Sequence, residues 1–261
     1  MKAKELAESL GLDVIYGDTD SIMIYTDSVN YDEVLQLGNK VKLAVNKLFS
    51  QLEIEIDGVY RSILLLKKKK YAALKVEGTD KHGSPFHKAE LKGLDIVRRD
   101  WCTLAKTTGE WIVNQILSPE VEMESAVSAI REKLMSVGRE ISTYEPVQFI
   151  ITKELARDVS QYNANSKAQA HVNVARRLTK FKKGDVVPYI ICEDGTNKSH
   201  NERAFHPEEV NERKNGVKVK REETEGENQN QKPNSEFSID YQYYLSHQMH
   251  PIVSRLCEPI E

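Results

Sequence analysis

The pattern of hydrophobic positions divides the first hundred residues into helices and strands. Leu6 and Leu10 lie four residues apart, which is the spacing of one helix face, and predict a helix over residues 2–10. Two apolar runs on either side of a short polar stretch predict a β-hairpin over residues 13–26. The other elements expected in this part are an amphipathic helix at 31–52 and strands at 54–66, 69–77 and near 87–92.

After residue 93 the apolar spacing becomes helical, so we expect a domain boundary near residue 100. The elements predicted beyond it are helices at 95–117, 121–141, 171–179 and 240–257, a loop at 157–169 and a strand at 186–192. Residues 208–236 are polar and charged and predict a disordered insertion. The fold class expected is α+β: an antiparallel sheet with packed helices in residues 1–99, followed by a mostly helical part in residues 100–261.

Composition narrows the class of protein. The 261 residues are 39% hydrophobic and 30% charged, which is typical of a soluble globular chain. No apolar run is long enough to span a bilayer, so no membrane partner is expected. The three cysteines are far apart and odd in number, which argues against a disulfide framework and against a zinc or iron–sulfur site.

The distribution of charge says more than the net charge of −3. Residues 1–59 carry 5 basic and 11 acidic side chains, whereas residues 60–100 carry 11 basic and 5 acidic ones. An acidic segment followed by a basic one suits metal ions held beside a phosphate backbone. Taken alone, the charge distribution still favours an ordinary protein surface on which charges happen to be uneven.

The most specific stretch is Tyr-Gly-Asp-Thr-Asp-Ser at residues 16–21, between the two apolar runs of the predicted hairpin. Alternate residues of a strand share a face, so the carboxylates of Asp18 and Asp20 can approach one cluster. Carboxylate oxygens are ligands that Mg²⁺ prefers, and paired ions suit phosphoryl or nucleotidyl transfer. The alternative is an ordinary surface turn.

A second stretch places four lysines and a tyrosine between two strand-like segments. Lys68, Lys69 and Lys70 would hold ammonium groups at fixed spacing, which suits backbone phosphates. Tyr71 would pack on a sugar or bond to a phosphate, or else simply pack in the strand.

A third stretch runs from Lys92 through Gly93 to Arg98 and Arg99. The glycine predicts a close approach to a ligand or backbone, and the arginines could clamp phosphates with Asp100 orienting one of them. An interdomain salt-bridge cluster explains this stretch equally well.

His171 stands near a predicted helix start, where a capping or core residue is the commoner role.

The chain resembles family B DNA polymerases in three features and in their order along the sequence. These are the hairpin, the lysine–tyrosine strand and the Lys-Gly…Arg-Arg-Asp junction. Residues 14–24 resemble that family's third polymerase motif. Residues 64–74, 90–101, 187–192 and 239–257 resemble the family's eukaryotic alpha branch most closely. The resemblance covers nearly the whole chain except residues 208–236.

The resemblance implies that residues 1–99 are the later part of a palm and residues 100–261 most of a thumb. Asp20 would bind both of two Mg²⁺ ions, with Asp18 close by. Residues implied to contact nucleic acid are Lys68, Lys69, Lys70, Tyr71, Lys92, Gly93, Arg98, Arg99 and His171. Implied partners are primer–template (DNA or RNA–DNA hybrid), deoxynucleoside triphosphates, a primase and an accessory subunit, in the nucleus.

Two departures from the family bear on activity. Ala170 replaces the proline that usually precedes the thumb histidine. The first metal-binding motif and the fingers are absent, so we expect a fragment of a longer polymerase that is inactive in isolation. A non-catalytic duplex-binding fragment and a structural protein whose Asp-Thr-Asp is a plain turn are the other two hypotheses.

Overall fold

The computed structural model describes residues 2–49, 51, 53–79, 85–162, 169–214 and 237–260, and the chain forms two compact units. The first unit comprises Met1–Leu94 and Val113–Ala126, and the second comprises Asp95–Ile112 and Val127–Glu261. Within the described residues, no helix has the length and apolar character needed to cross a membrane.

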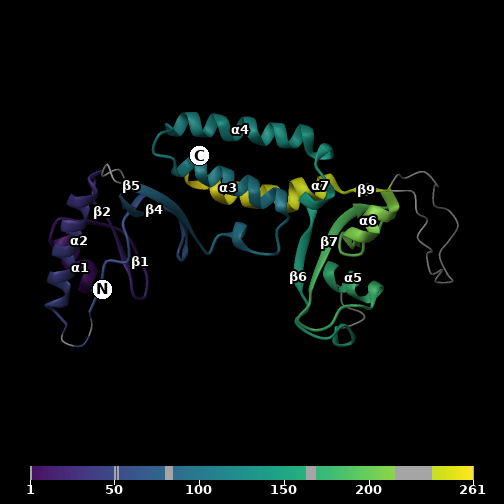
Figure 1. The fold of residues 1–261 in the computed structure, drawn as a ribbon, viewed down its shortest axis with the longest axis horizontal. Helices are drawn as coiled ribbons and strands as arrows, with labels where there is room; N and C mark the ends of the chain where they lie inside the picture. Colours follow the sequence, from purple (N-terminus) through teal and green to yellow (C-terminus); the bar gives the residue numbers. More distant parts are fainter. Residues whose placement is uncertain are drawn as a thin grey trace. The chain divides into compact units, whose positions relative to one another are not determined.

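The first unit combines helices with two antiparallel sheets (Figure 1). Its elements are α1 (Lys2–Ser9), β1 (Asp13–Gly17), β2 (Ile22–Tyr25), α2 (Tyr31–Asn46), β3 (Tyr60–Lys67), β4 (Lys70–Thr79) and β5 (Pro85–Lys92). Strands β1 and β2 form one sheet, and β3, β4 and β5 form the other in that order. The predicted hairpin and the predicted basic strands are therefore present.

Local chemistry explains where helix α2 begins and ends. Its first turn is capped by Asn30, whose side chain accepts hydrogen bonds from the amides of Asp32 and Glu33. The helix ends at Asn46, not at residue 52 as the apolar spacing predicted. The amide group of Asn46 bonds both backbone groups of Ile54, at 2.8 Å and 3.1 Å, and β3 begins only at Tyr60.

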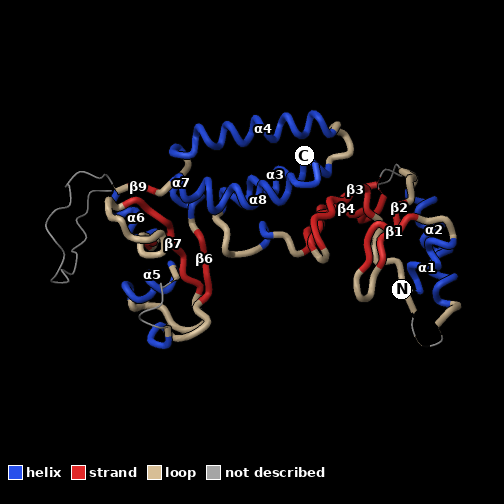
Figure 2. The backbone as a smooth tube through the Cα atoms, turned by 180° about the vertical axis from the view of Figure 1, so that it is seen from behind, coloured by secondary structure: helices blue, strands red, loops and turns tan. Residues whose placement is uncertain are grey.

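The second unit contains most of the remaining helices and a four-stranded antiparallel sheet (Figure 2). Two helices run across the limits of the units, α3 (Thr103–Leu117) and α4 (Met123–Glu140). The others are α5 (Ala170–Leu178), α6 (Pro207–Lys214), α7 (Tyr241–Tyr243), a π-helical stretch (Tyr244–Met249) and α8 (His250–Cys257). The strands are β6 (Ile151–Glu154), β7 (Val186–Glu193), β8 (Ala204–Phe205) and β9 (Ser238–Ile239).

Strand β7 is the centre of this sheet, because it pairs with β6, β8 and β9. Its residues 189–192 are buried, and α5 and α6 pack beside it. Helix α8 runs along α3, where a side chain on Gly109 would meet Ile252 and Leu256 (Figure 2). Small size at Gly109 therefore lets the two helices approach closely.

The predicted α+β class with antiparallel sheets is confirmed, with differences in the second unit. Residues 208–214, placed in the predicted disordered insertion, lie in helix α6, which begins with Pro207 and the acidic residues 208 and 209 that favour a helix start. The rest of that insertion and residues 163–168 of the predicted loop lie outside the described residues.

Cation–π contacts hold the end of α6. The guanidinium of Arg213 lies 4.5 Å from the centre of the Phe205 ring and 4.9 Å from that of Phe237. Arg177 of α5 lies 5.0 Å from the same Phe205 ring and bonds Glu209. Helix α6 is thus fixed to the sheet and to α5 by paired charges and aromatic rings.

Candidate nucleic-acid interface

The acidic motif forms the tip of the β1–β2 hairpin. The amide of Asp18 donates to the carbonyl of Ser21 over 2.9 Å and closes the turn, which leaves Thr19 and Asp20 at the apex. Asp20 is exposed, whereas Asp18 is half-buried. The two carboxylates therefore have different environments, although the sequence pattern treats them alike.

The basic motif forms the turn of the β3–β4 hairpin, with Lys68 and Lys69 as its two turn residues. Lys69 has a φ of +63°, which is unusual for a residue with a side chain. Its amide donates to the hydroxyl of Tyr16 over 2.9 Å. Gly93 packs against it, since a Cβ there would lie 2.3 Å from the Lys69 carbonyl oxygen. The predicted close approach at Gly93 is to the backbone of the lysine turn.

The two hairpins meet through an ion-paired carboxylate. The Nζ atoms of Lys68 and Lys69 lie 3.7 Å and 3.5 Å from the carboxylate oxygens of Asp18. Burial, the largest influence, raises the pKa of Asp18, but the Thr19 amide and the charges of Lys69 and Lys68 together hold that pKa below its usual range. Asp18 therefore stays ionised and ties the acidic tip to the basic turn.

A cluster of aromatic rings lies beside this junction. The ring of Tyr71 is 6.4 Å from that of Tyr16 and 6.5 Å from that of Tyr60. Its hydroxyl donates to Oε1 of Glu90 over 3.1 Å. Tyr16, Tyr60 and Glu90 are members of the site that the sequence analysis did not single out. Tyr16 could have been found from the sequence, because it is the first residue of the Tyr-Gly-Asp-Thr-Asp-Ser motif.

The other residues predicted in the first unit lie on the same sheet. Lys70 opens β4, and Lys92 closes β5 with its Nζ atom 3.5 Å from Glu90 Oε1. Residue 92 lies directly opposite Tyr71 in the ladder. The structure thus gathers the predicted lysines, Tyr71 and Gly93 next to the acidic hairpin.

Arg98 and Arg99 belong to the second unit. Both are exposed, and each pairs with an acid: Arg98 with Asp95 at 3.9 Å and Arg99 with Glu154 at 3.7 Å. Asp100 was expected to orient one of these arginines, but their partners in the structure are Asp95 and Glu154. Asp95 is also bonded by Arg255 of α8, so this junction is a salt-bridge cluster.

His171 is a core residue of the second unit. Its side chain is 2% exposed, near the start of α5, and its Nδ1 atom has no hydrogen-bond partner in the described part of the chain. Burial is the main cause that lowers the pKa of His171 to about 4. The positive charge of Lys153 contributes to this lowering, and the negative charge of Asp100 opposes the shift more weakly. This burial favours the core role over direct contact with nucleic acid.

The donor set for a metal ion is small. Among the described residues there is no cluster of three or more histidine, cysteine, aspartate or glutamate side chains that could hold one. Asp20 offers exposed carboxylate oxygens, which fit a hard divalent cation, and Asp18 shares its oxygens with two ammonium groups. These residues can supply part of a Mg²⁺ site, with further ligands from elsewhere.

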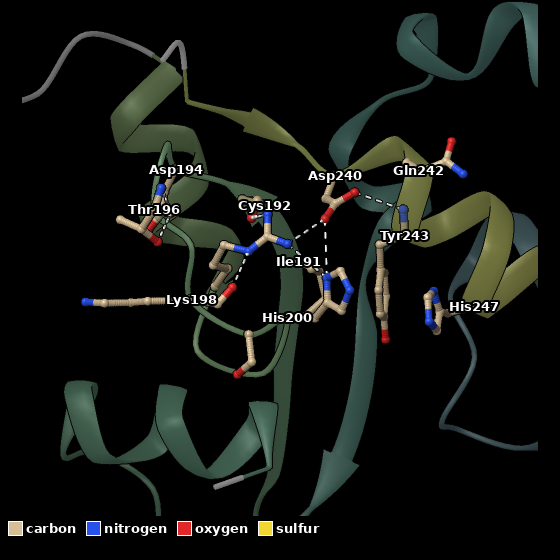
Figure 3. A network of polar contacts seen from close by, with 12 residues as sticks. Ile191, Cys192, Asp194, Thr196, Lys198, His200, Asp240, Gln242, Tyr243 and His247 are labelled. Atoms are coloured by element: carbon tan, nitrogen blue, oxygen red, sulfur yellow. Dashed lines mark hydrogen bonds and ion pairs between the residues drawn. The ribbon is translucent and has the colours of Figure 1, made fainter. Parts of the chain in front are cut away.

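A second polar network lies in the other unit (Figure 3). Buried Asp240 accepts the Tyr243 amide over 2.8 Å and lies 3.1 Å from the Arg203 guanidinium, which also bonds the carbonyl of Cys192. The ring of His200 lies 5.0 Å from that of Tyr243. The network caps helix α7 and ties it to β7.

Comparison with known proteins identifies relatives along the whole chain. The family model described as DNA polymerase family B matches residues 1–260. The chain is 46% identical to the DNA polymerase alpha catalytic subunit of Mus musculus and 44% identical to that of Xenopus laevis, over 100% of this chain in each case. It covers 17% of each relative, so it spans about a sixth of their length.

The chain is also similar to a solved structure. The family B DNA polymerase from the hyperthermophilic archaeon Pyrobaculum calidifontis matches 98% of this chain with a TM-score of 0.63 and 25% sequence identity. The match covers 28% of that polymerase chain.

Proposed function

The chain belongs to DNA polymerase family B, and on that basis we propose that it is the later palm and most of the thumb of a DNA-directed DNA polymerase. Residues 1–99 form the palm part and residues 100–261 the thumb part. The alpha catalytic subunits to which the chain is similar suggest a role in replication initiation, with extension of RNA–DNA primers.

One observation carries the proposal: the acidic hairpin and the basic hairpin touch within one unit. Lys68 and Lys69 reach Asp18 at 3.7 Å and 3.5 Å, while Asp20 stays exposed at the apex. A carboxylate that can bind a cation therefore lies next to ammonium groups that can bind a phosphate backbone. Nucleotidyl transfer at the end of a primer needs both groups together.

In this mechanism each residue has a separate task. Asp20 would hold the divalent ions, and Asp18, which fixes Lys69, would complete the site. Lys68, Lys69, Lys70 and Tyr71 hold the primer strand. Mg²⁺ bound there would lower the pKa of the primer 3′ hydroxyl and neutralise charge on the triphosphate.

Partners follow from the same proposal. The substrates are a primer–template duplex, either DNA or an RNA–DNA hybrid, and deoxynucleoside triphosphates. A primase and an accessory subunit are the protein partners, and the nucleus is the location.

We predict that Asp20→Asn, in a complete polymerase subunit containing this chain, abolishes incorporation and leaves primer–template affinity within about twofold. Loss of the charge removes several kcal/mol of transition-state stabilisation, on the order of a thousandfold in rate or more. Single-nucleotide incorporation and fluorescence anisotropy of a labelled duplex measure the two effects.

The matched control is Asp13→Asn, because Asp13 is an exposed acid at the other end of the same hairpin. It should keep full incorporation. Incorporation that survives in Asp20→Asn would refute the assignment.

A second function is favoured for the 261-residue chain in isolation: duplex binding without chemistry. The observation behind it is that Asp18 and Asp20 are not joined by a third acid, histidine or cysteine in the described residues. We expect salt-sensitive binding to primer–template and no primer extension with Mg²⁺. Extension by this chain would show that its own residues complete the active site.

A further inference from the structure

Glu90 occupies a central place on one face of the β3–β4–β5 sheet. In the ladder it lies opposite Ala73, with Tyr71 opposite Lys92 on one side and Lys75 opposite Lys88 on the other. Residues directly opposite one another share a face, so Glu90 is a diagonal neighbour of both Tyr71 and Lys75. Because Ala73 is small, the carboxylate has room to reach across β4 to strand β3.

The carboxylate of Glu90 gathers the polar groups of this face. Oε1 accepts from the hydroxyl of Tyr71 at 3.1 Å and from that of Tyr60 at 3.4 Å. The Nζ atoms of Lys92 and Lys75 lie 3.5 Å and 3.9 Å from its two oxygens. A half-buried acid with two phenols and two ammonium groups around it fixes the positions of all four side chains.

Tyr71 connects this carboxylate to the lysine turn. Its ring contacts that of Tyr16, and the Tyr16 hydroxyl accepts the amide of Lys69. A continuous series of contacts therefore runs from Glu90 through Tyr71 and Tyr16 to the turn that holds Lys69.

We infer that Glu90 is a positioning residue that orients Tyr71, and through it the lysine turn, for contact with the primer strand. The inference rests on the proposed function, since it names a residue that prepares the same site. Burial first, then Tyr60 and Glu90, raise the pKa of Tyr71, so its hydroxyl stays protonated and donates to the carboxylate at neutral pH.

A positioning role and a simple surface charge predict opposite changes in duplex affinity when Glu90 is removed. A carboxylate close to a phosphate backbone repels it, so if Glu90 were only a surface charge its removal would tighten binding. If Glu90 positions Tyr71, its removal weakens binding although the chain becomes less negative.

The first experiment measures duplex affinity of the 261-residue chain by anisotropy. Glu90→Ala should raise the Kd for primer–template about tenfold, the size of one lost hydrogen bond to a charged group. Glu90→Gln keeps an acceptor for both hydroxyls and should stay within about twofold of the parent chain. Glu77→Ala, an exposed acid on β4, is the matched charge control and should not weaken binding.

In a Tyr71→Phe background, Glu90→Ala should have little further effect, because the two residues act as one unit. Tighter or unchanged binding in Glu90→Ala would overturn the inference.

A second experiment does not depend on nucleic acid. With tyrosines labelled at Cζ, the NMR signal of Tyr71, assigned with Tyr71→Phe, should shift and titrate at lower pH in Glu90→Ala but less so in Glu90→Gln. An unmoved Tyr71 signal would overturn the inference whatever the affinities are. Failure of the parent chain and the complete subunit to bind primer–template would instead refute the proposed function.

Discussion

The backbone of Lys69 is held in a left-handed conformation by its neighbours. A residue with a side chain at a φ of +63° carries a cost of about 1 kcal/mol or more. The Tyr16 hydroxyl bonds its amide, and the absence of a side chain at Gly93 leaves room for its carbonyl. Two residues distant in sequence therefore set the position of the lysine proposed to hold the primer.

We predict that Gly93→Ala destabilises the first unit by about 2–4 kcal/mol, because it adds both a strained φ and a backbone clash. Gly11→Ala is the matched control: its φ is +78° and nothing lies within 4 Å of an added Cβ, so only the strain remains. Urea unfolding followed by circular dichroism compares the two. Equal losses in both variants would show that the approach to Lys69 is not tight.

The buried imidazole of His171 makes stability depend on pH. Its pKa is about 4 when folded and about 6.5 when unfolded, so between these values the unfolded chain binds the extra proton. We predict that the free energy of unfolding is fully retained above pH 6.5 and falls toward pH 4, by up to about 1.4 kcal/mol per pH unit from this group.

Urea unfolding at several pH values, followed by tryptophan fluorescence, measures this effect, because Trp101 and Trp111 both lie in the second unit. His171→Phe should flatten the dependence, and the exposed His250→Gln should leave it unchanged. An identical slope in His171→Phe would contradict the buried neutral imidazole.

Among the elements, the π-helical stretch is joined to the central strand by a buried hydrogen bond. The hydroxyl of fully buried Tyr244 accepts the amide of Ile191 over 3.0 Å, and its ring lies 4.9 Å from that of Phe149. A wider helical turn is uncommon and marks a local requirement, here a tyrosine hydroxyl at a β7 amide.

We predict that Tyr244→Phe costs about 1–3 kcal/mol, since it leaves a buried amide without a partner. Tyr241→Phe is the control, because Tyr241 also packs on Phe149 and is only half-buried. Thermal unfolding of the two variants gives the difference. A loss in Tyr244→Phe no greater than in Tyr241→Phe would show that the hydroxyl contributes little.

Elements with a clear apolar period were predictable from the sequence, and short ones were not. Helices α1, α4 and α5 and the strand β7 appear close to their predicted ranges. Helices α2 and α3 are present but shorter than predicted, because α2 ends at Asn46 and not at residue 52, and α3 begins at Thr103 and not at residue 95. Strands β6, β8 and β9 have four residues or fewer, too short for a period, and depend on pairing with β7. Ile54 and Ile56 alternate with acidic residues as in a strand, but residues 54–59 lie outside β3.

The candidate site was predictable only where a motif carries it. The contact of Asp18 with Lys69 joins two stretches that the sequence had marked. The hydroxyl of Tyr16 and the carboxylate of Glu90 have roles set by strand register and ring packing, which composition does not encode. Arg99 pairs with Glu154, which is 55 positions away in the sequence. A pair at that separation depends on the fold, so the sequence suggested the neighbouring Asp100 instead, which was wrong.

At the scale of the whole molecule, the uneven charge of the sequence becomes a local contact. The acidic first 59 residues and the basic segment 60–100 meet where Asp18 pairs with Lys68 and Lys69. Asp18 thereby fixes the position of both lysines, and the gathering of basic side chains at this point would let a chain of net charge −3 hold a duplex, as proposed.

We predict that Lys69→Ala weakens primer–template binding and lowers the slope of log K against log salt by about 0.9, the value of one lost phosphate contact. Anisotropy titrations between low and moderate salt measure the slope. Lys4→Ala, which removes an exposed lysine paired with Glu8 on α1, should leave it unchanged. An unaltered slope in Lys69→Ala would place the phosphates elsewhere.

The cation–π contact between Arg213 and Phe237 bears on how this protein can evolve. These two residues flank positions 215–236 and touch each other. Where both ends of a segment are already joined, doubling its length adds only about 0.6 kcal/mol of closure entropy. Insertions and deletions can thus accumulate at this point among related genes while the surrounding architecture is inherited unchanged.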